Sequence, residues 1–119
     1  MSPESRDVAY LWDMLDAAEA VYEFTKDVNF TRYIKERMCQ LAVERCMEII
    51  GEAARKVSDS FKQKYPEIPW QSIIAQRNVI AHEYGEIKQE RIFAHATKNI
   101  PRLIDQLKPL IPILPEDKK

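Results

Sequence analysis

Apolar residues recur at steps of three and four positions through most of the chain, which is the spacing of one face of an α-helix. The first stripe predicts a helix from about Ser5 to about Asp27, with Val8, Leu11, Trp12, Leu15, Ala18 and Tyr22 on its apolar face. The second predicts a longer helix, capped by Asn29 or Thr31, that carries Ile34, Met38, Ala42, Cys46, Ile49, Ala53 and Val57. Each apolar face needs a partner, so the pattern predicts helices that pack on one another.

The second helix has a glycine in its interior and proline stops beyond its end. Gly51 lies where glycine costs about 1 kcal/mol relative to alanine, which indicates that another backbone packs closely there. Residues 58–60 predict an extra helical turn that continues through Tyr65. Pro66 and Pro69 then end this turn.

Two more helices follow in the pattern. One starts at Pro69 and Trp70, because proline in a first turn lacks only a donor that has no partner there, and Gly85 stops it. Its apolar residues are Ile73, Ile74, Ile80 and Ala81. The last begins near Lys88, with a kink expected at Pro101, and carries Ile92, Phe93, Ala96, Ile100, Leu103, Ile104 and Leu107.

The predicted fold class is all-α, an antiparallel bundle of four to five helices joined by short turns. A length of 119 residues with 45% hydrophobic residues is typical of one domain, so residues 1–119 are predicted to form a single helical domain. Only two glycines occur, which argues against an all-β sandwich. Residues 109–119 are rich in proline and are predicted to be a frayed tail.

Several classes of function are disfavoured by the composition. No apolar run is long enough for a membrane span and the first residues lack a signal pattern, so we expect a cytoplasmic protein with no membrane contact. Cys39 and Cys46, seven positions apart on one helix, have Cα atoms roughly 10 Å apart and cannot form a disulfide. No Cys/His pair has zinc spacing, so we expect no metal and no cofactor. A net charge of −1 means that any RNA contact depends on a local patch.

Residues 77–84 hold the polar side chains with the clearest chemical potential. At about 100° per residue, Arg77, Asn78 and His82 fall at roughly 0°, 100° and 140° on a helix, and Tyr84 falls near −20° if the helix extends so far. These residues therefore share one polar side of an otherwise apolar helix. Asn78 lies four residues before His82, so its amide is placed to bond the imidazole and fix the tautomer.

Two interpretations of this set stay open at this level. In the structural one, Arg77 extends toward water, Asn78 and His82 form core hydrogen bonds, and Tyr84 caps the helix. In the catalytic one, His82 removes the proton of a ribose 2′-hydroxyl while Arg77 holds the phosphate, and metal-free cleavage leaves a 2′,3′-cyclic phosphate. That reaction needs an acid as well as a base, and a two-fold dimer that pairs the third predicted helices, residues 69–85, of two chains near its axis would supply both.

The segment from Arg77 to Tyr84 also matches the motif of a known family: Arg, four residues, His, any residue and Tyr, with the Asn that commonly follows the Arg. In these residues, in residues 49–54 and 66–70 and in the Leu/Ile-rich last helix, the chain resembles the HEPN domains. Within them it is most similar to the HepT-like ribonuclease toxins, which are paired with MNT-type nucleotidyltransferase antitoxins. The likeness covers nearly the whole chain.

This resemblance implies a homodimeric HEPN-like bundle of four to five helices with a composite RNA-cleaving site at the dimer cleft. Arg77 and His82 would be catalytic and Asn78 supporting, in a metal-independent endoribonuclease that acts as the toxin of a type VII toxin–antitoxin system. The partner nucleotidyltransferase would silence it by attaching AMP to Tyr84. HEPN domains also serve as non-catalytic adaptors of nucleotidyltransferases, and the intact motif favours the enzyme over this alternative.

Other residues near the motif carry further expectations. The basic residues in and around it either gather around the cleft or solvate helix ends; they are Lys62, Lys64, Arg77, Lys88 and Arg91. Glu48 or Glu52 is placed to pair with Arg77 across the bundle. His95 is expected at a helix surface or core edge, and Trp12 and Trp70 as core or interface anchors.

Overall fold

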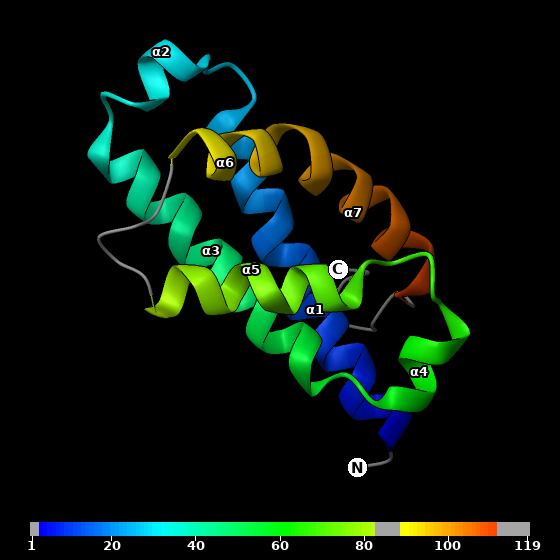
Figure 1. Cartoon of the computed structure of the whole chain (residues 1–119). Coiled ribbons are helices and arrows are strands. Elements are labelled where there is room, and N and C mark those ends of the chain that lie inside the picture. The colour runs from blue at the N-terminus through cyan, green and yellow to red at the C-terminus, as the bar shows by residue number, and fades with distance from the viewer. Residues whose placement is uncertain (1–2, 83–88, 112–119) are drawn as a thin grey trace.

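The computed structural model describes residues 3–82 and 89–111 of the chain, and these residues form helices and turns without a strand (Figure 1). The α-helices are α1 (Pro3–Thr25), α2 (Phe30–Tyr33), α3 (Arg37–Lys56), α4 (Asp59–Lys64), α5 (Trp70–His82), α6 (Gln89–Ala94) and α7 (Ile100–Leu107). A π-helical turn, η2 (His95–Asn99), joins α6 to α7, and a 3-10 turn, η3 (Lys108–Leu110), follows α7. The all-α prediction is confirmed.

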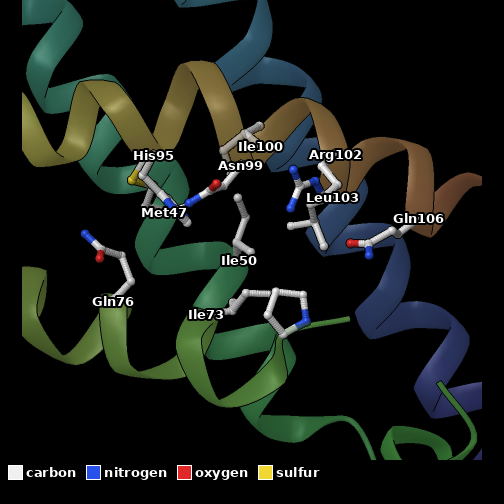
Figure 2. Close-up of a pocket in the computed structure, with 11 residues that line it drawn as sticks. Met47, Ile50, Ile73, Gln76, His95, Asn99, Ile100, Arg102, Leu103 and Gln106 are labelled. Atoms are coloured by element: carbon white, nitrogen blue, oxygen red, sulfur yellow. Dashed lines mark hydrogen bonds between the residues drawn. The ribbon is translucent and has the colours of Figure 1, made fainter. Parts of the chain in front are cut away.

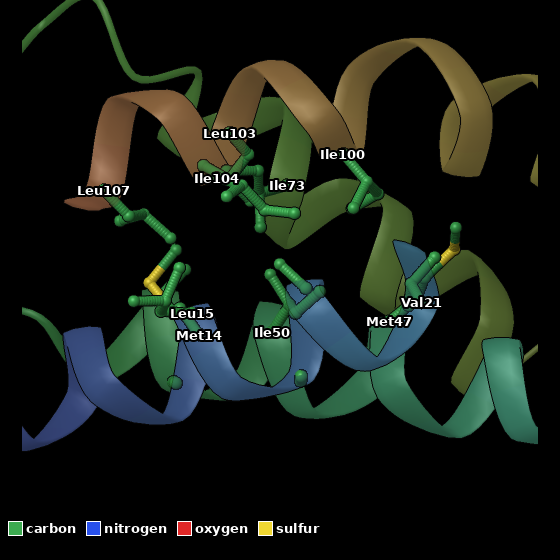
Figure 3. Close-up of a cluster of buried hydrophobic side chains, with 14 of the residues drawn as sticks. Met14, Leu15, Val21, Met47, Ile50, Ile73, Ile100, Leu103, Ile104 and Leu107 are labelled. Atoms are coloured by element: carbon green, nitrogen blue, oxygen red, sulfur yellow. The ribbon is translucent and has the colours of Figure 1, made fainter. Parts of the chain in front are cut away.

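The two long helices, α1 and α3, lie side by side and run in opposite directions (Figure 1). Helix α5 crosses α3, and α7 runs back in the direction opposite to α5. Figure 3 shows side chains of these four helices meeting in one core, among them Leu15 and Val21 of α1, Met47 and Ile50 of α3, Ile73 of α5, and Leu103 and Leu107 of α7. The core therefore fixes α5, which carries the candidate chemistry.

The single long second helix of the prediction is wrong, because the chain leaves the helix between Tyr33 and Arg37. Asn29 does cap α2, as expected, by accepting a hydrogen bond from the backbone N–H of Arg32 at 2.9 Å. The break is stabilised by the buried Gln40, whose amide donates to the carbonyl oxygens of Tyr33 and Ile34, at 3.1 Å each. Carbonyls at the end of α2 thus find a side-chain partner instead of the next helical turn.

The buried face of α3 departs from the predicted stripe near the start of the helix, whereas Ala53 and Val57 of that stripe are buried as predicted. Ile34 and Met38 are 44% and 86% exposed, although both were predicted to face the core. The residues that α3 does bury include Val43, Met47 and Ile50. An apolar surface therefore remains uncovered where α2 meets α3.

The disturbance expected at Pro101 takes the form of a change in hydrogen bonding one turn earlier. Proline has no N–H to donate to the carbonyl four residues before it. In η2 the backbone N–H of Ile100 bonds to the carbonyl of His95, which is the π-helical pattern. The helical run continues past the proline, and the predicted tail begins in η3; residues 112–119 lie outside the described residues.

The start of α4 is tied to the start of α1. Ser58 caps α4, as predicted for residues 58–60, by accepting from the N–H of Phe61 at 3.2 Å. The buried carboxylate of Asp7 in turn accepts from the Ser58 backbone N–H at 2.9 Å and from its hydroxyl at 2.7 Å. These hydrogen bonds link the N-terminal part of α1 to the N-terminus of α4 at one end of the bundle.

Two further findings bear on the class of protein. Among the helices of the described residues, none is both long and apolar enough to cross a membrane. Cys39 and Cys46 are free and half-buried, and burial raises the pKa of both thiols, so they stay protonated at neutral pH.

Candidate active site

The crossing of α5 over α3 depends on Gly51. A Cβ atom at this position would overlap the Cβ of Arg77 and lie 3.2 Å from the carbonyl oxygen of Ile73. The prediction that another backbone packs closely against Gly51 is therefore confirmed. Since the missing side chain lets α5 approach, it also sets the position of Arg77.

Replacing Gly51 by Ala is expected to lower the free energy of unfolding by about 1–3 kcal/mol, because the added methyl group must push α5 away from α3. Chemical denaturation monitored by circular dichroism measures this loss. The exposed Ser72 of α5 offers a control, since Ser72→Ala removes one hydroxyl and should change stability by under about 0.5 kcal/mol. Equal stability of the Gly51→Ala and native proteins would contradict the close crossing.

Arg77 is held at this crossing by two polar contacts. Its Nη2 lies 3.3 Å from Oε2 of Glu52, and its Nη1 donates to Oδ1 of Asn78 at 3.1 Å. The predicted pair across the bundle is thus confirmed for Glu52. The Arg77 side chain is 28% exposed, and its buried Nε has no hydrogen-bond partner among the described residues. These two contacts orient the guanidinium from one side, and some of its N–H groups remain unused as hydrogen-bond donors.

The carboxylate of Glu52 contacts three cationic side chains. It accepts a hydrogen bond from Arg55 at 2.7 Å and lies 3.8 Å from Nζ of Lys56, in addition to its contact with Arg77. The Arg55 hydrogen bond lowers the pKa of Glu52, so the carboxylate is charged at neutral pH. Three positive groups around one negative group leave this spot positive.

Arg55 and Lys56 are site residues that the sequence analysis did not single out. The signal for them was present, since they follow Glu52 at three and four positions on one helix. Lys62 of the predicted basic patch lies at the same end of α3, where its Nζ is 3.4 Å from the carbonyl oxygen of Arg55. The cations that share Glu52 with Arg77 are thus Arg55 and Lys56, which were not part of the predicted patch.

A polar groove runs beside Arg77 between α1 and α3. It has a volume of about 200 Å³ and is lined by Tyr10, Asp13, Arg45, Glu48, Ile49, Glu52, Ala53, Lys56 and Arg77. Charges of both signs face it, and Arg45 pairs with Glu48 at 3.5 Å. The groove leaves room for a polar ligand next to the Arg77 guanidinium.

His82 is the last residue of α5, five positions after Arg77 on the same helix. Asn78 is exposed and bonds Arg77; its predicted bond to His82 falls outside what the structure describes. Tyr84 and Lys88 also lie outside the described residues. The structure thus brings Arg77 and Asn78 together, and it places His82 at the end of their helix.

The chain after the motif is anchored at Gln89, the first residue of α6. The hydroxyl of Tyr33 donates to Oε1 of Gln89 at 3.0 Å, and Nε2 of Gln89 donates to Glu44 at 2.7 Å. Aromatic contacts add to this anchor, since the rings of Tyr33 and Phe93 lie 4.9 Å apart. The segment 83–88 is therefore bounded by α5 on one side and by a residue fixed to α2 and α3 on the other.

His95 lies apart from these residues, at a pocket between α5 and α7 (Figure 2). It is half-buried, as expected for a residue at the core edge, and its Nδ1 lies 2.8 Å from Nδ2 of Asn99. Burial lowers the pKa of His95, so the ring is neutral at pH 7. Trp70 is buried in the core and Trp12 packs against it, in line with their predicted role as anchors.

Possible ligands for a metal ion are scattered rather than grouped in the part of the chain that the structure describes. No set of three His, Cys, Asp or Glu residues comes close enough there to hold an ion.

Comparison with known proteins identifies the family. The family model described as "Ribonuclease HepT-like" matches residues 14–110. A protein of Methanocaldococcus jannaschii named "Putative RNase MJ1380" is 37% identical over 99 residues, which cover 82% of this chain and 91% of that protein. The "Probable ribonuclease HepT" of Thermococcus cleftensis is 34% identical over 94 residues, covering 79% and 86%. No solved structure matches the chain.

The fold and these relatives together define the class, a small all-helical domain of the ribonuclease type. More narrowly, the chain belongs to the HepT-like ribonuclease family.

Proposed function

We propose that this protein is a metal-independent endoribonuclease whose catalytic residues are Arg77 and His82. The observation that carries the proposal is the placement of Arg77. It is set by the Gly51 crossing, held by Glu52, and open to a polar groove, while His82 ends the same helix. A fixed arginine beside a groove is suited to a phosphate, because its fork matches two phosphate oxygens.

In the proposed reaction His82 removes the proton from a ribose 2′-hydroxyl, and the 2′-oxygen attacks the adjacent phosphorus. The bond from phosphorus to the 5′-oxygen breaks, and that oxygen takes up a proton from a general acid. The products are a 2′,3′-cyclic phosphate and a 5′-hydroxyl. Arg77 stabilises the negative charge that grows on the phosphate oxygens, and Asn78 supports Arg77 through the hydrogen bond from Nη1.

The local charge near Arg77 supports binding of RNA in spite of the overall net charge of −1. Arg55, Lys56 and Arg77 surround the single carboxylate of Glu52, so phosphate groups meet a positive spot at this end of the groove. Single-stranded RNA carries one phosphate per nucleotide, and each phosphate that a lysine or arginine neutralises releases a condensed counterion, which favours binding.

The test of the proposed function is cleavage of RNA by the purified protein. Mixed tRNA and mRNA are incubated with it, with and without a chelator, and the new ends are identified by mass spectrometry. We expect cyclic phosphate ends in both samples. Cleavage that stops on addition of the chelator would refute metal independence, and absence of cleavage in every sample would refute the proposal.

The general acid in this proposal is His82 of a second copy of the chain, since each chain has one histidine in the motif. A two-fold dimer is supported by the uncovered apolar residues where α2 meets α3, namely Ile34, Met38 and Leu41. From Leu41 a stripe at helical spacing leads along α3 through Arg45 and Glu48 to Glu52, the partner of Arg77. A copy that covers this apolar surface also lies near the candidate site.

Light scattering at micromolar concentration is expected to give the mass of a dimer. Met38→Glu places a charge on the uncovered surface, so it should shift the protein toward monomer and lower RNA cleavage in proportion to the dimer lost. The exposed Lys98→Glu, on η2, serves as the matched control and should leave both unchanged. A native protein that stays monomeric while cleaving RNA would contradict the shared site.

The proposed biological role is that of a toxin in a type VII toxin–antitoxin pair. Its antitoxin would be a nucleotidyltransferase of the MNT type that transfers AMP to Tyr84. Support for this role comes from the family and from the motif, in which Tyr84 follows His82 by two positions.

A further inference from the structure

The groove between α1 and α3 extends well beyond the guanidinium of Arg77. On the α3 side it is lined from Arg45 to Lys56, a distance of roughly 16 Å along the helix at about 1.5 Å per residue. On the α1 side it is lined by Tyr10 and Asp13, because α1 lies alongside α3 (Figure 1). A phosphate held by Arg77 therefore leaves the rest of the groove to the adjoining part of an RNA strand.

Part of the groove is apolar and includes an aromatic side chain. Tyr10 of α1 and Ile49 of α3 are half-buried and pack against the core, and Ala53, which also lines the groove, is buried. Packing against the core holds the Tyr10 side chain in place. Unpaired bases of single-stranded RNA stack on aromatic side chains of this kind. The groove thus offers a surface for a base beside the arginine that suits its phosphate.

Tyr10 lies toward the C-terminal end of α3, where the candidate arginine is held. The helices α1 and α3 run in opposite directions, and Asp7 of α1 accepts a hydrogen bond from Ser58, just beyond the end of α3. Tyr10 follows Asp7 by about one helical turn, so it lies beside the last turns of α3, which include Glu52. Asp13 lies one further turn along α1, toward the middle of α3.

Asp13 brings a negative charge to the groove that the described part of the chain does not neutralise. Its side chain is exposed, and within the described residues its carboxylate forms no ion pair and accepts no hydrogen bond. The other carboxylates of the groove, Glu48 and Glu52, are each paired with an arginine. Since a carboxylate repels phosphate groups, the part of a nucleotide that suits Asp13 is the base, which carries hydrogen-bond donors.

The four bases of RNA differ in how well they suit a carboxylate. Cytosine and adenine each carry an exocyclic amino group that donates to a carboxylate oxygen, and guanine carries an amino group beside a ring N–H. Uracil has no amino group, and carbonyl oxygens flank its one N–H on both sides, so its edge repels a negative charge. A carboxylate at the position of the base therefore selects against uracil.

We propose that Tyr10 and Asp13 form a base subsite, in which Tyr10 stacks the base next to the cleaved phosphate and Asp13 accepts a hydrogen bond from the amino group of that base. The inference rests on the proposed function, because Arg77 is taken to hold the cleaved phosphate. It makes Asp13 the residue that determines specificity. Cytosine, adenine or guanine is accepted in the subsite, and uracil is disfavoured.

Binding of short single-stranded RNAs measures the selectivity of the subsite separately from cleavage. Fluorescence anisotropy is recorded with 2′-O-methyl oligomers of adenosine, cytidine or uridine, which internal attack cannot cleave. We expect the uridine oligomer to bind the native protein about fivefold or more weakly than the better of the other two. Equal binding of all three oligomers, or binding of none, would overturn the proposal.

The variant Asp13→Asn assigns the selectivity to one side chain. An amide offers a donor as well as an acceptor, so it pairs with a uracil oxygen as readily as with an amino group, and the preference should fall to within about twofold. Asp16→Asn is the matched control, because Asp16 is exposed on α1 outside the groove and loses the same charge. This control should keep the native preference. A preference that persists in Asp13→Asn, or that disappears equally in both variants, would contradict the role of Asp13.

Two variants of Tyr10 test the stacked base. Tyr10→Leu keeps apolar bulk against the core but removes the flat ring, so it should weaken binding of the preferred oligomer about fivefold or more. Tyr10→Phe keeps the ring, so its affinity should stay within about twofold of that of the native protein. Circular dichroism checks that both variants are folded. Native affinity in the folded Tyr10→Leu protein would show that no base stacks there.

Mapping of cleavage sites separates failure of the subsite from failure of the proposed function. A defined RNA that contains all four bases is incubated with the native protein and with Asp13→Asn, and the new ends are sequenced. We expect native cuts beside adenine, cytosine or guanine, and additional cuts beside uracil in the variant. Native cuts beside every base, without selectivity in oligomer binding, would refute the subsite and leave the ribonuclease. Selective oligomer binding without cleavage would refute the ribonuclease and support the subsite as part of an RNA-binding groove.

Discussion

Replacing His82 by Ala is expected to lower the rate of RNA cleavage by about 10²- to 10⁴-fold, because the proposed reaction loses the group that moves the proton of the 2′-hydroxyl. Arg77→Ala should cause a loss of about 10²- to 10³-fold by removing the charge that stabilises the attacked phosphate. Single-turnover cleavage of a defined RNA measures both effects, since product release does not then limit the rate.

Both variants should remain folded, which separates a chemical effect from a structural one. His82 lies at the end of α5 as the structure describes it, and alanine there has a high helix propensity. Removing Arg77 leaves Glu52 paired with Arg55 and Lys56, so no charge is left alone. The stem of Arg77 packs over Gly51, and Arg77→Gln is a second variant that keeps part of that stem while losing the charge.

His95→Ala is the matched control for His82→Ala. His95 lies at the pocket between α5 and α7 rather than near Arg77, so its removal should change the chemical step less than tenfold. Full RNase activity and toxicity of His82→Ala would show that the site assignment is wrong even within the correct family.

The helices were predictable wherever the pattern depends on local spacing. The stripes that define α1 and α5 and the close approach at Gly51 follow from the order of residues alone. The break before Arg37 was not predictable, because the capping side chain of Gln40 is six or seven residues from the carbonyls that it binds. At Pro101 the disturbance was foreseen, but the sequence did not tell a kink from a π-helical turn.

The candidate site was predictable to the extent that its residues lie in one segment. Arg77, Asn78 and His82 occupy one helix and form a short motif, so their proximity needs no knowledge of the fold. The choice of Glu52 over Glu48 as the partner of Arg77 required the crossing geometry. The pocket between α5 and α7 was not predicted, because its lining is assembled from α3, the start of α5, η2 and α7, which are distant in sequence.

Modification of Tyr84 is expected to silence the protein. In the proposed pair, the antitoxin transfers AMP to the Tyr84 hydroxyl, which adds a phosphodiester charge and a bulky purine two residues after His82. The attached phosphate would pair with the nearby cations that otherwise bind RNA, and the purine would occupy space needed by the substrate. Inhibition of this kind requires no change of fold.

Co-expression with the partner nucleotidyltransferase should therefore increase the mass of the protein by one or more AMP units on Tyr84 and remove its toxicity. Tyr84→Phe lacks the acceptor hydroxyl, so it should escape modification and stay toxic in the presence of the partner. Tyr65→Phe is the matched control; Tyr65 lies beyond α4 and packs against Phe61, with ring centroids 4.7 Å apart, so this variant should still be modified and silenced. Peptide mass spectrometry that finds the adduct on Tyr65 or another tyrosine, with Tyr84 unmodified, would overturn the proposal, because AMP attached there would not place its phosphate next to the motif.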